Sequence, residues 1–94
     1  MAADPTVRAE VLYEGHVQGV GFRFTVQSLA RHCDVTGYVQ NLPAGRVCLV
    51  AEGPRAEVDS LVTEVARRME GYIQHQDRRD SPARGEFSDF AIRH

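Results

Sequence analysis

The sequence predicts an α+β fold in which two helices cover one face of an antiparallel sheet. Segments with alternating apolar residues and segments with helical periodicity follow in the order strand, helix, strand, strand, helix, strand, with one further weak strand near the end. The chain has 94 residues, enough for one domain, and two helices cannot bury their apolar stripes on each other alone at this size. A sheet with both helices on one face buries both stripes.

The first strand is expected at residues 7–13 and the first helix from Phe22 onward. Positions 7, 9, 11 and 13 of the strand are apolar or aromatic and alternate with polar ones, although Leu12 interrupts the pattern. Residues 1–6 are expected to form a flexible tail, and residues 7–94 a single domain. The helix has one apolar stripe, which consists of Phe22, Val26, Leu29, Ala30 and Cys33.

A hairpin is expected next, with strands at residues 35–42 and 46–52. The turn Leu42-Pro43-Ala44-Gly45 contains proline and a glycine that is free to adopt positive φ. Pro54 then stands where the first turn of a second helix tolerates proline, and Gly71 ends that helix. Its apolar stripe consists of Val58, Leu61, Val62, Val65 and Met69.

The end of the chain is expected to complete the sheet. Residues 72–78 form a weak, polar strand that suits a sheet edge, residues 80–86 a mobile loop, and residues 88–93 a closing strand with Phe90 and Ile92 in register. This element order is that of a ferredoxin-like α/β sandwich (βαββαβ) with an antiparallel sheet. Because the fold carries many functions, the function has to be argued from a site.

The composition argues against several classes of protein. The formal net charge is −2 and all 11 basic residues are arginines, so we expect no nucleic-acid partner and no lysine-dependent chemistry. Cys33 and Cys48 are too few for a disulfide scaffold or a thiolate zinc site, and they suit a reducing compartment. No apolar run is long enough for a membrane helix, and the first residues do not resemble a secretory signal. We expect a cytoplasmic monomer.

The loop between the first strand and the first helix is a candidate anion site. It reads Gly15-His16-Val17-Gln18-Gly19-Val20-Gly21-Phe22 and leads into a helix N-terminus, where unpaired N–H groups can hold a phosphate. Arg23 stands in the first helical turn, and its planar guanidinium can bond two phosphate oxygens. A plain turn followed by a solvated arginine is the alternative. The spacing matches neither a dinucleotide fingerprint nor a P-loop.

Asn41 is a polar residue at the end of an otherwise apolar row. It shares a face with Val35, Gly37 and Val39, and this face is expected to look toward the helices. Its amide can both donate and accept, so in a cleft beside the helix N-terminus it could hold a water molecule in a fixed direction. The alternative is a turn residue that bonds the local backbone.

Together, these segments resemble the acylphosphatase family. The first reads Gly15-x-Val17-Gln18-Gly19-Val20-x-Phe22-Arg23, and the second reads Gly37-Tyr38-Val39-Gln40-Asn41, followed by Gly45, Val47 and Gly53 at the family's spacing. Phe90-x-Ile92 is similar to the family's closing strand, so the resemblance covers residues 7–94. The departures are Tyr13, where the family usually has an aliphatic residue, and the polar residues 72–78.

The resemblance implies hydrolysis of acyl phosphates to a carboxylate and inorganic phosphate. It implies that Arg23 binds the phosphate, that Asn41 orients the attacking water, and that backbone N–H groups within residues 15–22 cradle the phosphate. It also implies a small acyl phosphate as substrate, phosphate and sulfate as competing anions, and no cofactor. The positions offer no side-chain base, and the family's proposed answer is that a phosphate oxygen of the substrate accepts the proton.

Other interpretations stay open on the residues alone. His16 lies at a variable position of the loop motif and is expected to face solvent. His32, His75 and His94 are scattered, so no metal site is expected. The alternative function is a non-catalytic ferredoxin-like module that binds RNA or another anion. RNA recognition motifs carry aromatic residues on the open face of their middle strands, and residues 46–52 have none.

Overall fold

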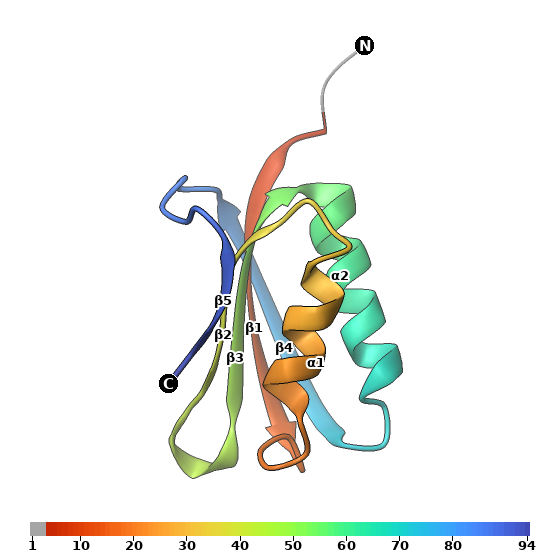
Figure 1. Ribbon diagram of the computed structural model, residues 1–94. Coiled ribbons are helices and arrows are strands. Elements are labelled where there is room, and N and C mark those ends of the chain that lie inside the picture. Colours follow the sequence, from red (N-terminus) through yellow and green to blue (C-terminus); the bar gives the residue numbers. More distant parts are fainter. Residues whose placement is uncertain (1–3) are drawn as a thin grey trace.

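The computed structural model describes residues 4–94, and this part of the chain contains five strands and two α-helices. The elements are β1 (Thr6–Gly15), α1 (Phe22–Ala30), β2 (Thr36–Asn41), β3 (Val47–Pro54), α2 (Arg55–Arg68), β4 (Ile73–Pro82) and β5 (Phe90–Arg93). A 3₁₀ turn, η1 (Pro43–Gly45), joins β2 to β3. The two helices lie side by side on one face of the sheet, as predicted (Figure 1).

The strand order in the sheet is β4-β1-β3-β2-β5. The first four strands are antiparallel neighbours, whereas β5 runs parallel to β2. The ferredoxin-like fold class is confirmed, but the sheet is mixed and not wholly antiparallel. The strand that completes the βαββαβ order is the polar β4 beside β1, and the C-terminal strand is added at the opposite edge.

The core lies between the sheet and the helices, where the apolar stripes predicted it. The buried helical residues are Phe22, Val26 and Ala30 of α1, and Val58, Leu61, Val62 and Val65 of α2. Leu29 and Cys33 are only partly buried against this core, and Cys33 lies beyond the end of α1. Each fully buried aliphatic side chain contributes about 1.5–3 kcal/mol of hydrophobic stabilisation. This layer therefore holds α1 firmly against the sheet.

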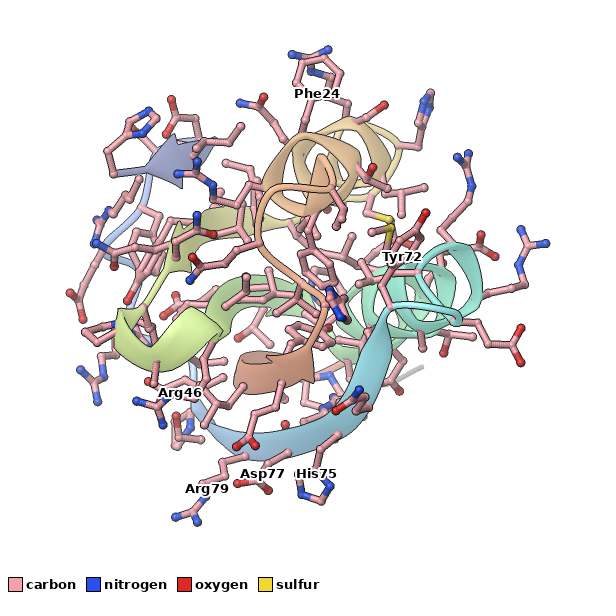
Figure 2. All side chains as sticks on the ribbon, turned by 90° about the horizontal axis from the view of Figure 1, so that it is seen from below. Phe24, Arg46, Tyr72, His75, Asp77 and Arg79 are labelled. Atoms are coloured by element: carbon pink, nitrogen blue, oxygen red, sulfur yellow. The ribbon has the colours of Figure 1, made fainter. Side chains whose placement is uncertain are left out.

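The strand at the β4 edge is longer than predicted. It pairs with β1 as far as Val7 opposite Pro82, so residues 80–82 belong to the strand and not to a loop. His75, Asp77 and Arg79 point away from the body of the molecule (Figure 2). A strand at the edge can be polar on its outer side, and it then lacks the apolar alternation that marks a strand in a sequence.

The described part of the expected N-terminal tail contacts α2. Residues 1–3 lie outside the described residues, and Thr6 already begins β1. The carbonyl of Pro5 accepts a hydrogen bond from the Arg55 N–H at 2.9 Å, and Asp4 Oδ2 accepts one from the Ala56 N–H at 2.8 Å. Asp4 and Pro5 thereby satisfy two N–H groups that the first turn of a helix leaves unpaired.

Candidate active site

The loop between β1 and α1 is anchored at its start and in its centre. The His16 N–H donates to the Tyr72 carbonyl at 2.9 Å. Gln18 Nε2 donates to the carbonyls of Leu42 and Arg46, both at 2.8 Å. The Gln18 side chain therefore ties the loop to the turn that follows β2, which fixes the loop relative to the end of that strand.

Left-handed backbone at Gly19 and Gly21 shapes the rest of the loop. Both residues have φ near 76°, and a Cβ at either position would meet open space, so conformation and not crowding favours glycine there. Among residues 4–94, no backbone carbonyl accepts a hydrogen bond from the N–H groups of residues 17–24. These N–H groups lie at the positive end of the α1 dipole, an arrangement suited to an anion.

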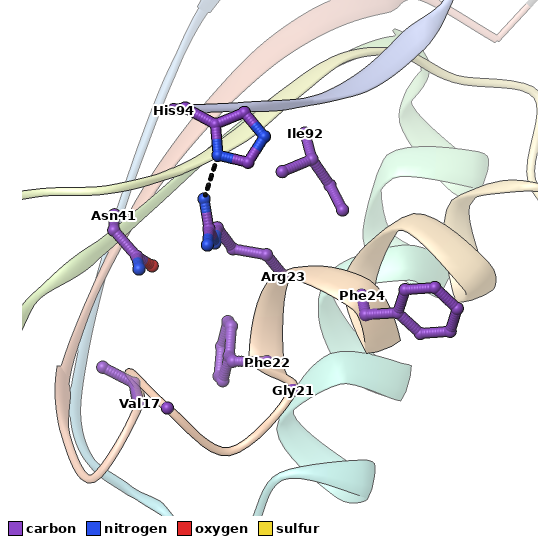
Figure 3. A pocket seen from close by; sticks show the side chains of 9 residues that line it. Val17, Gly21, Phe22, Arg23, Phe24, Asn41, Ile92 and His94 are labelled. Carbon is purple, nitrogen blue, oxygen red and sulfur yellow. Dashed lines mark hydrogen bonds between the residues drawn. The ribbon is translucent and has the colours of Figure 1, made fainter.

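A cavity of about 270 Å³ opens beside the first turn of α1 (Figure 3). The residues that line it are Val17, Gly19, Gly21, Phe22, Arg23, Phe24, Asn41, Ile92 and His94. The loop, α1, β2 and the end of the chain all contribute to this lining. Segments far apart in the sequence thus meet at one end of the sheet.

Phe22 fixes the position of the first helical turn. Its ring is 2% exposed and packs on the Tyr13 ring, with 5.0 Å between the ring centroids. Burial raises the pKa of Tyr13, whose hydroxyl has no hydrogen-bond partner within residues 4–94. The contact holds the start of α1 on β1 and thereby fixes the position of the Arg23 backbone.

Arg23 and Asn41 reach the cavity from different elements (Figure 3). Arg23 Nη1 donates to the Arg93 carbonyl at 3.2 Å and lies 3.3 Å from His94 Nδ1, so the guanidinium extends from α1 toward the end of β5. Asn41 Oδ1 is buried and has no hydrogen-bond partner within residues 4–94. A buried polar group in this state costs about 1–3 kcal/mol, a cost that a bound water or ligand can offset.

The predicted site residues are only partly brought together. Val17, Gly19, Gly21, Phe22, Arg23 and Asn41 line the cavity, whereas Gly15, His16, Gln18 and Val20 do not. The His16 N–H is already bonded and its side chain is exposed. Phe24, Ile92 and His94 also line the cavity, although no sequence pattern pointed to them. Alternation along the last strand could have grouped Ile92 with residue 94, but it could not tell which strand lies next to them.

Within the described chain, no three or more His, Cys, Asp or Glu side chains are placed to hold a metal ion. Burial raises the pKa of both thiols, Cys33 and Cys48. Neither helix of residues 4–94 is long and apolar enough to cross a membrane.

Comparison with known proteins identifies the family. The model of the acylphosphatase family matches residues 9–92. An acylphosphatase of Nocardia farcinica is 42% identical over 94 residues, covering 98% of this chain and 92% of that protein. An acylphosphatase of Methylococcus capsulatus is 41% identical over 86 residues, covering 90% of this chain and 94% of that protein. The chain belongs to the acylphosphatase family.

Solved acylphosphatase structures have the same fold. The crystal structure of the Bacillus subtilis acylphosphatase matches with a TM-score of 0.84 at 29% identity, over 94% of this chain and 99% of that one. The Coxiella burnetii acylphosphatase matches with a TM-score of 0.81 at 31% identity, over 95% and 94%. The resemblance found in the sequence is confirmed, and with it the family's reaction, the hydrolysis of acyl phosphates.

Proposed function

We propose that Arg23 and the N–H groups of residues 17–22 bind the phosphoryl group of an acyl phosphate, and that Asn41 orients the attacking water. One observation chiefly supports this assignment. The guanidinium of Arg23, the amide of Asn41 with its unpaired oxygen, and glycines 19 and 21 of the loop border the same cavity. The proposed set of phosphate-binding N–H groups begins at residue 17, because the His16 N–H is already bonded to the Tyr72 carbonyl.

Phosphoryl transfer requires positioning and charge stabilisation more than covalent chemistry from the protein. Arg23 and the loop N–H groups place positive charge where negative charge accumulates on the phosphoryl oxygens. The water held by Asn41 attacks phosphorus, forming a P–O bond while the bond to the acyl oxygen breaks and a carboxylate leaves. A phosphate oxygen accepts the proton of the water, as in the family's proposed mechanism, so no side-chain base is needed.

The experiment that tests the activity is phosphate release from a small acyl phosphate such as benzoyl phosphate. We expect turnover with a chelator present, since the proposed groups are a guanidinium, amides and backbone N–H. Loss of turnover with a chelator and its return with a divalent ion would contradict this expectation. Stable phosphate monoesters should be poor substrates, because their leaving group needs a proton and the proposed mechanism gives no side chain the role of donating one.

Inorganic phosphate and sulfate are proposed to compete with the substrate for Arg23 and the loop. Competitive inhibition that disappears in Arg23→Ala would support a shared site. Noncompetitive inhibition, or inhibition that is unchanged in Arg23→Ala, would place the anion elsewhere.

We also propose that the protein is a cytoplasmic monomer, with residues 7–94 as one domain and no nucleic-acid partner. The net charge of −2 supports the last point. So does Tyr38 on the open face of the sheet, since the Arg93 guanidinium lies 3.9 Å from its ring centroid and covers it. Light scattering checks the monomer, and a mass of two chains would contradict it.

A further inference from the structure

His94 is the one histidine that lines the cavity. Alternation along β5 explains its position, because Ile92 packs against the core and Arg93 turns to the opposite face, over Tyr38. The next residue returns to the helix side (Figure 3). Gln40 Nε2 donates to the main-chain oxygen of His94 at 3.4 Å, and Gln40 is the register partner of Arg93. The parallel pairing of β5 with β2 therefore places His94 at the cavity.

No acidic side chain among residues 4–94 lines the cavity, so its positive charge is not neutralised by a neighbouring carboxylate side chain. Arg23 and His94 are the ionisable residues of its lining, and β2 contributes the uncharged amide of Asn41. Arg93 turns its own charge to the other face, and His16 is exposed and outside the lining. Since His94 Nδ1 lies 3.3 Å from Arg23 Nη1, a neutral imidazole can accept a hydrogen bond from the guanidinium.

We infer that His94 is a second phosphate-binding side chain, whose protonated imidazole donates a hydrogen bond to a dianion beside Arg23. The inference rests on the proposed function, because it requires the phosphoryl group beside Arg23. Histidine gains and loses its charge between pH 5 and 8 more readily than other side chains. A nearby anion favours the charged form, which then donates to the anion instead of accepting from Arg23. Anion affinity therefore rises as the pH falls.

The test is inhibition of acyl phosphate hydrolysis by sulfate at pH 8 and pH 5.5. Sulfate stays a dianion over this range, so a change in its inhibition constant comes from the protein. For the unchanged protein, we expect the constant to fall about three- to fivefold at pH 5.5, the upper part of the range for one partly exposed charge pair. In His94→Gln it should stay within about twofold, and in His94→Lys it should be low at both pH values.

A control variant separates the effect of His94 from other effects of pH on the protein. His75→Gln changes an exposed histidine of β4 and should keep the pH response of the unchanged protein. In a protein of residues 1–94, the terminal carboxylate stays ionised over this range and is common to every variant. Circular dichroism and the thermal midpoint establish that each variant is folded.

The possible outcomes are distinct. An inhibition constant that does not change with pH, or that changes equally in His94→Gln, would overturn the role of His94 while leaving the phosphate site in place. Sulfate that fails to compete at either pH would overturn the proposed phosphate site itself, and the role of His94 with it. Competition that strengthens at low pH only where residue 94 is histidine is the result we expect.

Discussion

The two ends of the sheet hold polar clusters of opposite character. At one end, Arg8 and Glu52 are 6% and 4% exposed, and Arg8 Nη1 lies 2.9 Å from Glu52 Oε2. The N–H groups of Arg84 and Gly85 donate to the same carboxylate at 3.0–3.1 Å. At the other end, the buried oxygen of Asn41 and the N–H groups of residues 17–24 have no partner within residues 4–94.

The difference shows how a structural cluster can be distinguished from a binding site. Burial alone would raise the pKa of Glu52, but the hydrogen bonds from Gly85, Arg84 and Arg8 outweigh it and hold that pKa below its ordinary value. Glu52 is thus stabilised in its ionised form by the protein itself. At the cavity, the Asn41 oxygen and the N–H groups of residues 17–24 have no internal partner, so a ligand can supply the missing hydrogen bonds.

The largest effect should come from removing the charge of Arg23, at the end of the sheet that carries the cavity. Arg23→Ala is expected to lower kcat/KM for an acyl phosphate about 10³-fold or more, as for other arginines that stabilise phosphoryl transfer. Arg23→Lys should recover little, because a point charge does not replace the planar fork. Arg31→Ala, at the exposed far end of α1, is the matched control and should keep full activity. Normal turnover in folded Arg23→Ala would contradict the assignment.

Removing the unpaired amide should separate rate from binding. Asn41→Ala is expected to lower kcat by roughly 10²–10³-fold, comparable to the loss of one preorganised hydrogen-bonding group, while phosphate still inhibits. The measurement is turnover together with the phosphate inhibition constant. Gln76→Ala removes an exposed amide from β4 and serves as the control. If Asn41→Ala turned over normally, Asn41 would be only the residue that ends β2.

At the end of the sheet that holds Arg8 and Glu52, a substitution should change stability and leave turnover unchanged. Glu52→Ala removes the buried partner of Arg8, which keeps only the exposed Glu10 and Glu86 beside it, and leaves the N–H groups of Arg84 and Gly85 without their acceptor. This should lower the free energy of unfolding by about 3 kcal/mol. The double variant Arg8→Met/Glu52→Leu should lose less, because apolar residues often replace a buried ion pair at small cost. Denaturant unfolding measures both. Glu64→Gln, in an exposed pair with Arg67, is the control and should cause no measurable loss.

The contribution of Glu52 to the free energy of unfolding should also depend on pH. Because the folded-state pKa of Glu52 is lowered, its contribution to stability is present above the unfolded value and is lost as the pH falls through the folded value. The difference in unfolding free energy between the unchanged protein and Glu52→Gln should therefore shrink below about pH 4.5. A difference that stays constant down to pH 3 would mean that the ionised carboxylate does not stabilise the fold.

The smallest effect concerns a polar atom that is unpaired but lies in the core. Tyr13 is 0% exposed, and its hydroxyl has no partner within residues 4–94. Tyr13→Phe removes the hydroxyl and keeps the ring contact with Phe22, so it should raise the free energy of unfolding by about 1 kcal/mol with unchanged turnover. Thermal unfolding and the phosphate-release assay measure the two quantities. A loss of activity would instead link this hydroxyl to the site.

Most of the fold followed from periodicity, and the exceptions lie at the two edges of the sheet. Residues such as Val11, Val39 and Val62 face one common core, so their spacing reports the strands and helices directly. The strand β4 faces solvent, and its ion pairs, such as that of Arg78 with Asp59 at 2.7 Å, leave no apolar pattern to read. The parallel pairing of β5 depends on contacts between distant segments, which local patterns do not encode.

The two residues on which backbone chemistry and motif agreed line one cavity, and their roles stay predictions. Arg23 was expected at a helix N-terminus and Asn41 at a strand end, and the structure places both at one cavity. The place of His94 in the cavity lining was not predicted, because it depends on which strand lies beside β5. The sequence could not show that the His16 N–H is already bonded, since its hydrogen bond to the Tyr72 carbonyl forms only in the folded chain.

The contact between Arg23 and the end of β5 also sets the timing of assembly during synthesis. The hydrogen bond from Arg23 to Arg93 joins residues 70 positions apart. A ribosome that adds about 5–20 residues per second needs roughly 4–14 s to cover that interval. The hairpin and the first helix can form on the nascent chain during this time, but the cavity gains Ile92 and His94 only when β5 docks. A chain truncated before β5 would therefore keep most of the apolar layer and lack one wall of the cavity.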